Sequence, residues 1–251
     1  MTRPVHLVPT PVLEAVGVGD TVVLEGAEGR HAVVVRRLRV GEVIDLVDGA
    51  GVRATVRISR LVDPSALEAE VLTIVTEPVP APRIVVVQAL AKGDRGETAV
   101  ETLTEVGVDV IVPWQAARCV VQWTGGKGAS GLARWSRIAV ESGKQSRRAR
   151  FPEVGAVAST DEVSVLIRSA AVALVLDETA DLALTLVSLP SVGDVVLVVG
   201  PEGGFTEEES AAFVAAGAVP VRLGPTVLRT STAGTVAAAV ILSATSRWQV
   251  Q

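Results

Sequence analysis

The feature that most constrains the fold is a series of short valine-rich runs in the second two-thirds of the chain. Runs of this length without polar residues are typical of strands that are buried on both faces of a parallel sheet. The runs are "RIVVVQAL", "VDVIVP", "AVALVLDE", "DVVLVVG" and "AVPVRLG". Between and after them, residues 94–106, 131–148 and 231–247 have helical character. This alternation predicts an α/β domain with a mainly parallel sheet.

The N-terminal part of the chain has a different rhythm. The segments "DTVVLEG", "EVIDLVDG", "VRATVRIS" and "LEAEVLTIV" alternate partially between apolar and polar residues and are separated by Gly and Asp turns. They predict a small β-barrel or sandwich over residues 1–75. Three prolines between Pro78 and Pro82 then form a stiff linker. We therefore place a domain boundary there and expect the α/β domain at residues 83–251.

The rarest residue types exclude several kinds of chemistry. The single cysteine, Cys119, has no partner for an internal disulfide, and no apolar run is long enough to span a bilayer. We therefore expect a soluble cytoplasmic protein without membrane contact. His6 and His31 are the only histidines, which argues against a His-rich metal site and against a Ser-His-Asp triad. No metal site is expected.

Positive charge is concentrated in two arginine-rich segments, although the net charge is -5. Residues 30–60 hold seven arginines against three acids, and residues 134–150 hold six basic residues against one acid. Such clusters are solvated faces or contacts to a polyanion, and arginine suits bidentate phosphate binding. Five of these arginines are the candidates for a contact with RNA or DNA: Arg36, Arg37, Arg39, Arg147 and Arg148. The first three are expected on a short helix in "RHAVVVRRLRVG".

Three loops follow strands of the predicted sheet and mark its ligand edge. They are "LDETAD" (176–181), "GPEGGFTEEE" (200–209) and "LGPTVLRTSTAG" (223–234). In open parallel sheets, ligands bind beyond the carboxyl ends of the strands. The three loops are therefore the candidate binding site.

The second loop is not a phosphate-binding loop, because no Gly-Lys-Ser/Thr follows it, and its glycine spacing is not that of the dinucleotide fingerprint. Thr206 and Glu209 predict a capping box, and two further glutamates complement the positive end of the helix. A helix terminus with so much negative charge repels phosphate, whereas Gly203 and Gly204 leave the backbone open to close approach. An ordinary strand-to-helix turn is one interpretation. The other is a neutral or cationic ligand, and S-adenosylmethionine (SAM), which carries a sulfonium and no phosphate, fits it.

The third loop has the same turn chemistry. Gly224 and Pro225 form a turn, and Ser231 or Thr232 can cap the final helix. Arg229 remains as a cation beside the candidate donor site, or as a solvated loop residue.

Together these motifs resemble the RsmE-type small-subunit ribosomal RNA methyltransferases of the SPOUT superfamily. The resemblance rests on "GPEGGFTEEE" followed by "LGPTVLRTSTAG", on "LRVGEVIDLVDGAG", on "ALAKGDRGETAVETLTEVGVDVIVP" and on "RWSRIAVESGKQSRRARFP". It extends over nearly the whole chain. The chain departs from the family pattern in three places: Ser231 stands where a glutamate is usual, Thr102 stands where a lysine is common, and the aromatic residue expected near the N-terminus is absent from "RPVHLVP".

The resemblance implies a PUA-like N-terminal barrel, a C-terminal trefoil knot and a homodimer. It also implies SAM as cofactor, 16S ribosomal RNA of the small subunit as partner, and methyl transfer to N3 of one uridine. By the same resemblance, Arg229 stabilises the negative charge that develops on the uracil, and Glu202 or Glu178 is the general base or only holds the loops. The donor site is expected to be lined, mainly through backbone groups, by Leu176, Gly200, Glu202, Gly203, Gly204, Leu223, Gly224, Leu228 and Thr230.

Two alternatives remain open from the sequence. The chain could be a SPOUT methyltransferase that acts on another RNA, such as transfer RNA. It could also be a non-catalytic RNA-binding assembly factor, because a fold by itself does not fix an activity.

Overall fold

The computed structural model describes residues 3–249, which form two compact units. The first unit comprises the chain up to Val79 together with Gly143–Phe151, and the second comprises Pro80–Ser142 and the chain from Pro152 onward. A short segment from the middle of the sequence thus belongs to the N-terminal unit. Each unit is described by itself.

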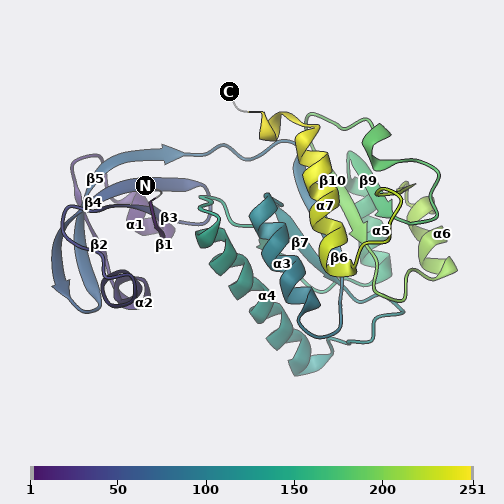
Figure 1. Ribbon diagram of the computed structural model, residues 1–251, viewed down its shortest axis with the longest axis horizontal. Coiled ribbons are helices and arrows are strands. Elements are labelled where there is room, and N and C mark those ends of the chain that lie inside the picture. Colours follow the sequence, from purple (N-terminus) through teal and green to yellow (C-terminus); the bar gives the residue numbers. More distant parts are fainter. Residues whose placement is uncertain (1–2, 250–251) are drawn as a thin grey trace. The chain divides into compact units, whose positions relative to one another are not determined.

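The first unit is built on one five-stranded sheet with the order β1-β3-β4-β5-β2 (Figure 1). Its strands are β1 (Val5–Leu7), β2 (Thr21–Leu24), β3 (Val43–Val47), β4 (Val52–Asp63) and β5 (Ala66–Thr76). Short helices α1 (Thr10–Glu14) and α2 (Gly26–Arg30) and a π-helix, η1 (His31–Val35), complete it. The four strand segments expected from the sequence correspond to β2–β5. Strand β1, which pairs in parallel with β3, was not predicted.

The second unit is built on a six-stranded sheet in which every strand pair is parallel. The strands lie in the order β11-β9-β10-β6-β7-β8 and are β6 (Arg83–Ala89), β7 (Val110–Trp114), β8 (Glu153–Val154), β9 (Val172–Leu176), β10 (Asp194–Val199) and β11 (Val219–Val221). The α-helices are α3 (Arg95–Val106), α4 (Gly125–Gln145), α5 (Thr160–Ser169), α6 (Glu207–Ala215) and α7 (Thr230–Ser243), with short 3-10 turns η2 (Leu184–Leu186) and η3 (Ser246–Trp248). The predicted α/β fold with a mainly parallel sheet is confirmed.

Helices α3 and α7 lie side by side against the centre of this sheet (Figure 1). The approach of α7 is close because its interior contains Gly234. A Cβ atom there would lie 3.2 Å from Val199 Cγ2 and 3.4 Å from Leu103 Cδ2. The small residues of α7 thus allow it to pack on the ends of β6 and β10, where the candidate loops begin.

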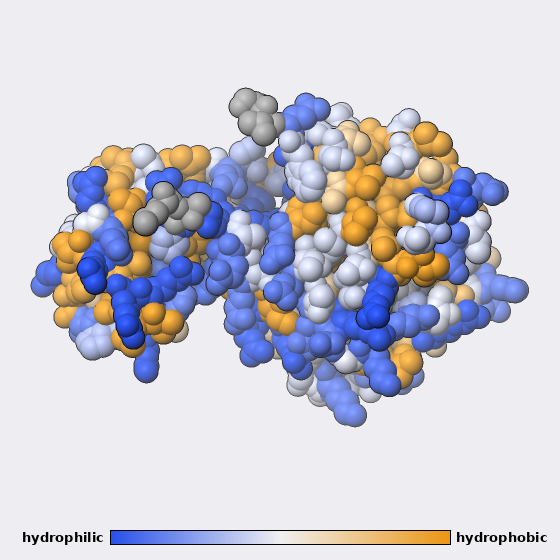
Figure 2. Space-filling model, viewed as in Figure 1, coloured by the Kyte–Doolittle hydropathy of each residue, from blue (hydrophilic) through white to orange (hydrophobic). Residues whose placement is uncertain are grey.

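Part of the outer surface of α7 and its surroundings is apolar. Figure 2 shows hydrophobic side chains gathered on this face of the second unit. Val236 on α7 is 41% exposed, and Leu186 in η2, which packs against α7, is 73% exposed. Exposed apolar patches are common at interaction sites, so this face is a candidate interaction surface.

Three helix boundaries differ from the sequence prediction. The basic helix expected at 131–148 is α4, which starts earlier and ends at Gln145, and Arg147 follows it with a positive φ of 59°. The short helix expected to carry Arg36, Arg37 and Arg39 ends at Val35, so these arginines follow it. The final helix begins at Thr230 with Arg229 as N-cap and no side-chain cap, so neither Ser231 nor Thr232 caps it. The Thr230 hydroxyl donates to the Gly200 carbonyl in the loop that follows β10.

No helix among residues 3–249 is both long and apolar enough to cross a membrane.

A buried ion pair closes the end of the second unit opposite to the candidate loops. Arg247 donates to the Asp109 carboxylate and to the carbonyls of Gly107 and Pro82, while Asp109 also accepts from the Ile84 N–H at 2.8 Å. The side chains of Arg247 and Asp109 are 13% and 5% exposed. Removal of one partner from such a pair leaves a buried charge without its counter-ion.

We therefore expect Arg247→Met to lower the free energy of unfolding by about 3 kcal/mol. The matched control is Arg83→Met, because Arg83 makes a comparable two-bond pair with Asp194 near the surface, where such pairs contribute less than about 1 kcal/mol. Urea unfolding followed by tryptophan fluorescence measures both. An equal loss of unfolding free energy in the two variants would show that burial does not increase the contribution of the Arg247 pair to stability.

Candidate functional site

The three predicted loops emerge at one edge of the parallel sheet. Strands β9, β10 and β11 run in the same direction, so their carboxyl ends meet there. The segments that flank the first and third loops are joined by backbone hydrogen bonds, from the Leu184 N–H to the Arg222 carbonyl at 3.0 Å and from the Arg222 N–H to the Leu182 carbonyl at 2.8 Å. The second and third are joined through Thr230, whose hydroxyl donates to the Gly200 carbonyl at 2.8 Å.

The expected donor-site residues all belong to these loops. Gly203 is less open than expected, because a Cβ atom there would lie 3.2 Å from Arg118 Cβ. Leu176, Leu223 and Leu228 are half-buried. Gly204 and Gly224 have positive φ values of 69° and 76°, and no protein atom lies within 4 Å of the place where a Cβ atom would stand. A ligand can therefore approach the backbone closely at both positions, and a larger residue would be strained there.

Glu202 is engaged with protein groups rather than with solvent alone. Its Oε1 accepts from Arg95 Nη1 at 2.9 Å and from the Lys92 N–H at 3.4 Å. Partial burial would raise the pKa of Glu202, but hydrogen bonds from its own N–H, from Arg95 and from Lys92 outweigh burial and lower this pKa. A carboxylate with a lowered pKa is a weak proton acceptor. The geometry therefore favours the loop-holding role for Glu202.

The predicted capping box at the start of α6 is confirmed. The Thr206 N–H donates to Glu209 Oε2 at 2.9 Å and the Glu209 N–H donates to Thr206 Oγ1 at 3.1 Å. The sequence did not reveal that Glu209 is buried and that its second oxygen accepts from the Ala117 N–H at 2.8 Å. Arg118 likewise donates to the Gly203 carbonyl at 3.0 Å. The 116–118 segment therefore fixes the glycine loop, a role without a local sequence signal.

Arg229 stands at the N-terminus of α7 and is exposed. No ion pair of Arg229 occurs among the residues that the structure describes. Ser231, by contrast, is buried in the first turn of the helix. Arg229 therefore offers its full positive charge next to the loops.

The proposed RNA-contacting arginines share one unit. Arg36, Arg37, Arg39 and Arg147 are exposed, and Arg148 is half-buried with its Nε donating to the Arg150 carbonyl at 2.8 Å. Residues 143–151 belong to the first unit, so all five come from the same unit although about a hundred positions separate them in the sequence.

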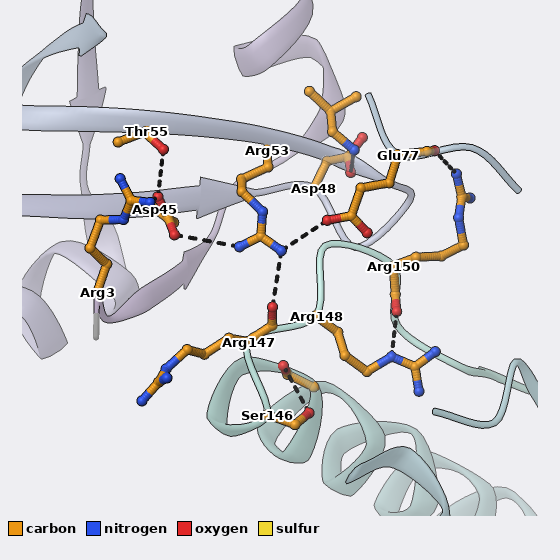
Figure 3. Close-up of polar contacts among 12 residues, drawn as sticks. Arg3, Asp45, Asp48, Arg53, Thr55, Glu77, Ser146, Arg147, Arg148 and Arg150 are labelled. Atoms are coloured by element: carbon orange, nitrogen blue, oxygen red, sulfur yellow. Dashed lines mark hydrogen bonds and ion pairs between the residues drawn. The ribbon is translucent and has the colours of Figure 1, made fainter. Parts of the chain in front are cut away.

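Arg53 determines the path of the chain at Arg147 (Figure 3). Its guanidinium donates to the Arg147 carbonyl at 3.0 Å, to Glu77 at 3.0 Å and to Asp45 at 3.4 Å. Arg37 and Arg147 are the two non-glycine residues with positive φ in residues 3–249. Strained backbone persists only where its surroundings fix it, and for Arg147 the bond from Arg53 does so.

A second polar cluster lies inside the first unit. His6 is buried and its Nδ1 lies 3.1 Å from Glu28 Oε2, while the Lys144 ammonium binds the other oxygen of Glu28. One ligand atom from each of His6, Glu28 and His31 lies within 4.8 Å of the others, a spacing that a metal ion could bridge. Lys144, however, already places a positive charge on the carboxylate, which opposes a second cation there. We interpret the cluster as a structural ion pair.

The chain matches known proteins over nearly its full length. Residues 77–242 match a family described as "RNA methyltransferase domain" and residues 24–72 one described as "RNA methyltransferase PUA domain". The ribosomal RNA small subunit methyltransferase E of Mycobacterium tuberculosis is 45% identical over 238 residues, 92% of this chain and 89% of that protein. The chain belongs to this RNA methyltransferase family. The Bacillus subtilis relative of the same name is 30% identical, covering 84% of this chain and 85% of that protein.

Solved methyltransferase structures agree with this membership. The ribosomal RNA small subunit methyltransferase E of Neisseria gonorrhoeae, bound to S-adenosyl methionine, superposes with a TM-score of 0.84 at 32% identity and covers 97% of this chain and 98% of that chain. A structure from Legionella pneumophila with bound SAM has a TM-score of 0.84 at 28% identity and covers 98% of this chain and 99% of that one. The methyltransferase and PUA domains thus correspond to the α/β and β-rich parts of this chain.

The Glu28 cluster generates a pH prediction. Burial by itself would raise the pKa of Glu28, but the hydrogen bonds from His6 and Lys144 outweigh it and lower the pKa from 4.5 to about 2. A pKa that folding lowers stabilises the fold above the unfolded value, and this stabilisation is lost as the pH falls from about 5 towards 2. Glu28→Gln should therefore cost at most about 3 kcal/mol at pH 7 and weaken the pH dependence in this range.

Urea unfolding by circular dichroism at pH 7 and pH 3.5 measures this effect, with hydrogen exchange of the first sheet as a local readout. Glu25→Gln is the control, since Glu25 is exposed on the same helix terminus. If Glu28→Gln keeps the full pH dependence of the unaltered protein, the cluster does not stabilise the unit as described.

Proposed function

We propose that this protein transfers a methyl group from SAM to N3 of a uridine in the 16S ribosomal RNA of the small subunit. The observation that carries the proposal is the backbone cradle at Gly204 and Gly224, which lies in loops that have acids and no phosphate-binding motif. Such a site suits a cationic methyl donor. The relatives named as small-subunit RNA methyltransferases, and the SAM in the Neisseria structure, support both the donor and the substrate class.

The donor would be held by Leu176, Gly200, Glu202, Gly203, Gly204, Leu223, Gly224, Leu228 and Thr230, mainly through backbone groups. SAM supplies an electrophilic methyl group on a sulfonium. The protein must then position the uridine and manage one proton, because N3 loses its hydrogen as it gains the methyl group. Arg229 would stabilise the negative charge that develops on the uracil oxygens. With Glu202 paired to Arg95, the exposed Glu178 of the first loop is the better-placed proton acceptor.

Three further features belong to the same proposal. The apolar face at α7 and η2, with Val236 and Leu186, supports a homodimer, which sedimentation equilibrium would test. Strand β11 is separated from β6 by β9 and β10, and the chain after it returns across the sheet to place α7 against α3 and β6, a path that supports the trefoil knot expected from the family. The match of residues 24–72 to a PUA domain supports the PUA-like barrel. A ribosomal RNA substrate places the enzyme in the cytoplasm.

Methyl transfer to small subunits that lack the modification, followed by nucleotide mapping, tests the function. Incorporation of labelled methyl at one uridine N3 of 16S RNA supports it. Incorporation into transfer RNA alone would identify another RNA as the substrate. If no RNA is methylated, the protein is a non-catalytic RNA-binding factor.

Arg229→Ala should retain SAM binding within about twofold and lower kcat by about a hundredfold, the scale for loss of one group that stabilises transition-state charge. Calorimetry with SAM and single-turnover methylation measure the two effects. Arg222→Ala is the control, because Arg222 is also exposed and directly precedes the same loop. Weakened SAM binding with intact turnover would refute the role assigned to Arg229.

Replacement of Arg36, Arg37, Arg39, Arg147 and Arg148 by glutamine should flatten the salt dependence of RNA binding. Each lost phosphate contact lowers the slope of log K against log salt by about 0.7–0.9. Filter binding at several salt concentrations measures the slope, and Arg168→Gln, an exposed arginine on α5, is the control. An unchanged slope would place the RNA surface elsewhere.

A further inference from the structure

Gln88 is an uncharged polar side chain in the otherwise apolar centre of the second sheet. It lies on β6, has no exposed surface, and pairs in register with Val199, the last residue of β10 before Gly200. The other side chains of β6 beyond Arg83 are valine, isoleucine and alanine. A leucine of similar size would suit this position by packing alone. Packing alone therefore does not explain why an amide occupies this buried position.

The hydrogen bonds of the amide have a fixed direction. Gln88 Nε2 donates to Thr230 Oγ1 at 3.0 Å and lies 3.3 Å from the carbonyls of Thr230 and Ala89. The single hydroxyl proton of Thr230 is given to the Gly200 carbonyl at 2.8 Å, so this hydroxyl must accept from Gln88. A flipped amide would bring an oxygen against two carbonyl oxygens. A relay thus runs from the Gln88 amide through the Thr230 hydroxyl to the Gly200 carbonyl.

The oxygen of the same amide destabilises the fold, although the relay is retained. Gln88 Oε1 is buried and has no hydrogen-bond partner among residues 3–249. It faces the close contact with α7, since a Cβ atom at Gly234 would lie 3.5 Å from it. An unpartnered buried acceptor destabilises the fold. Proteins retain buried polar atoms without a hydrogen-bond partner mainly at functional sites.

The relay connects the parts of the chain that form the donor loops. Thr230 is the first residue of α7 and is buried, and Gly200 begins the glycine loop after β10. Both residues are distant from β6 in the sequence, so no local interaction could bring them to Gln88.

We propose that Gln88 is a positioning residue for the methyl donor: its amide holds the N-terminus of α7 and the carbonyl of Gly200 at the separation that the donor requires. The inference rests on the proposed donor site, because Gly200 and Thr230 belong to it. Gln88 itself has no exposed surface and acts through Thr230.

The test compares Gln88→Leu, Thr230→Val and Thr230→Ser. The leucine and valine remove the amide and the hydroxyl at nearly constant volume, and the serine keeps the hydroxyl. We expect the first two variants to raise the Kd for SAM about tenfold in calorimetry, with RNA affinity unchanged. Thr230→Ser should stay within about twofold of the unaltered protein. Because the two groups act in one relay, the double variant should bind SAM no more weakly than Thr230→Val alone.

A readout without SAM separates positioning from general stability. The amides of residues 200–204 should exchange faster with solvent in Gln88→Leu and in Thr230→Val, while those of β7 stay protected. The matched control is Thr104→Val, which removes a buried hydroxyl that donates within α3 to the Val100 carbonyl at 2.7 Å. An equal loss of SAM affinity in Thr104→Val would overturn the proposal, as would unchanged SAM affinity in Thr230→Val or additive losses in the double variant. If Gln88→Leu does not fold, Gln88→Met takes its place, because Thr230 is itself expected to line the donor site.

Failure of the proposed donor site is recognised separately with Leu228→Ala. If this lining variant weakens SAM binding and the relay variants do not, the site stands and the role of Gln88 is wrong. If Leu228→Ala also binds SAM normally, the placement of the donor itself is wrong, and the proposal for Gln88 falls with it.

Discussion

The parallel pairing of β6 with β10 is the interaction on which the rest of the second unit depends. It places Gln88 beside Val199 and so brings the end of one strand next to the start of the glycine loop. Helix α7 can then close over both strands because Gly234 allows contact at van der Waals distance. The proposed donor loops are thus held on one side by the sheet and on the other by a helix from the end of the chain.

The acidic residues around the glycine loop have different tasks. Glu209 is buried and holds both the start of α6 and the Ala117 N–H, while Glu202 is paired with Arg95. These two carboxylates bind protein groups and keep the loop in place. Glu207 and Glu208 remain exposed at the helix N-terminus, where negative charge is stabilising. The carboxylates of this loop therefore fix its geometry, and two of them also complement the positive end of α6.

The arginines show where prediction from sequence stops. Their clustering is visible in the composition, and a contact with RNA was inferred from it. Their predicted helical setting was wrong, because α4 ends at Gln145 and η1 ends at Val35. Local propensity could not reveal these ends, since the turn at Arg147 is held by Arg53 from a strand far away in the sequence. That long-range bond overrides the helical preference of the residues around it.

The sequence by itself determined the main strands of both units, the parallel sheet, the capping box at Thr206 and the three loops of the candidate site. These features depend on local periodicity and turn chemistry, which act over a few residues. Only the tertiary structure decided that Gln88 contacts Thr230, that Arg118 and Ala117 hold the glycine loop, and that residues 143–151 belong to the first unit. Each of these contacts joins segments distant along the chain, and hydrogen bonds between such segments leave no periodic trace in the sequence.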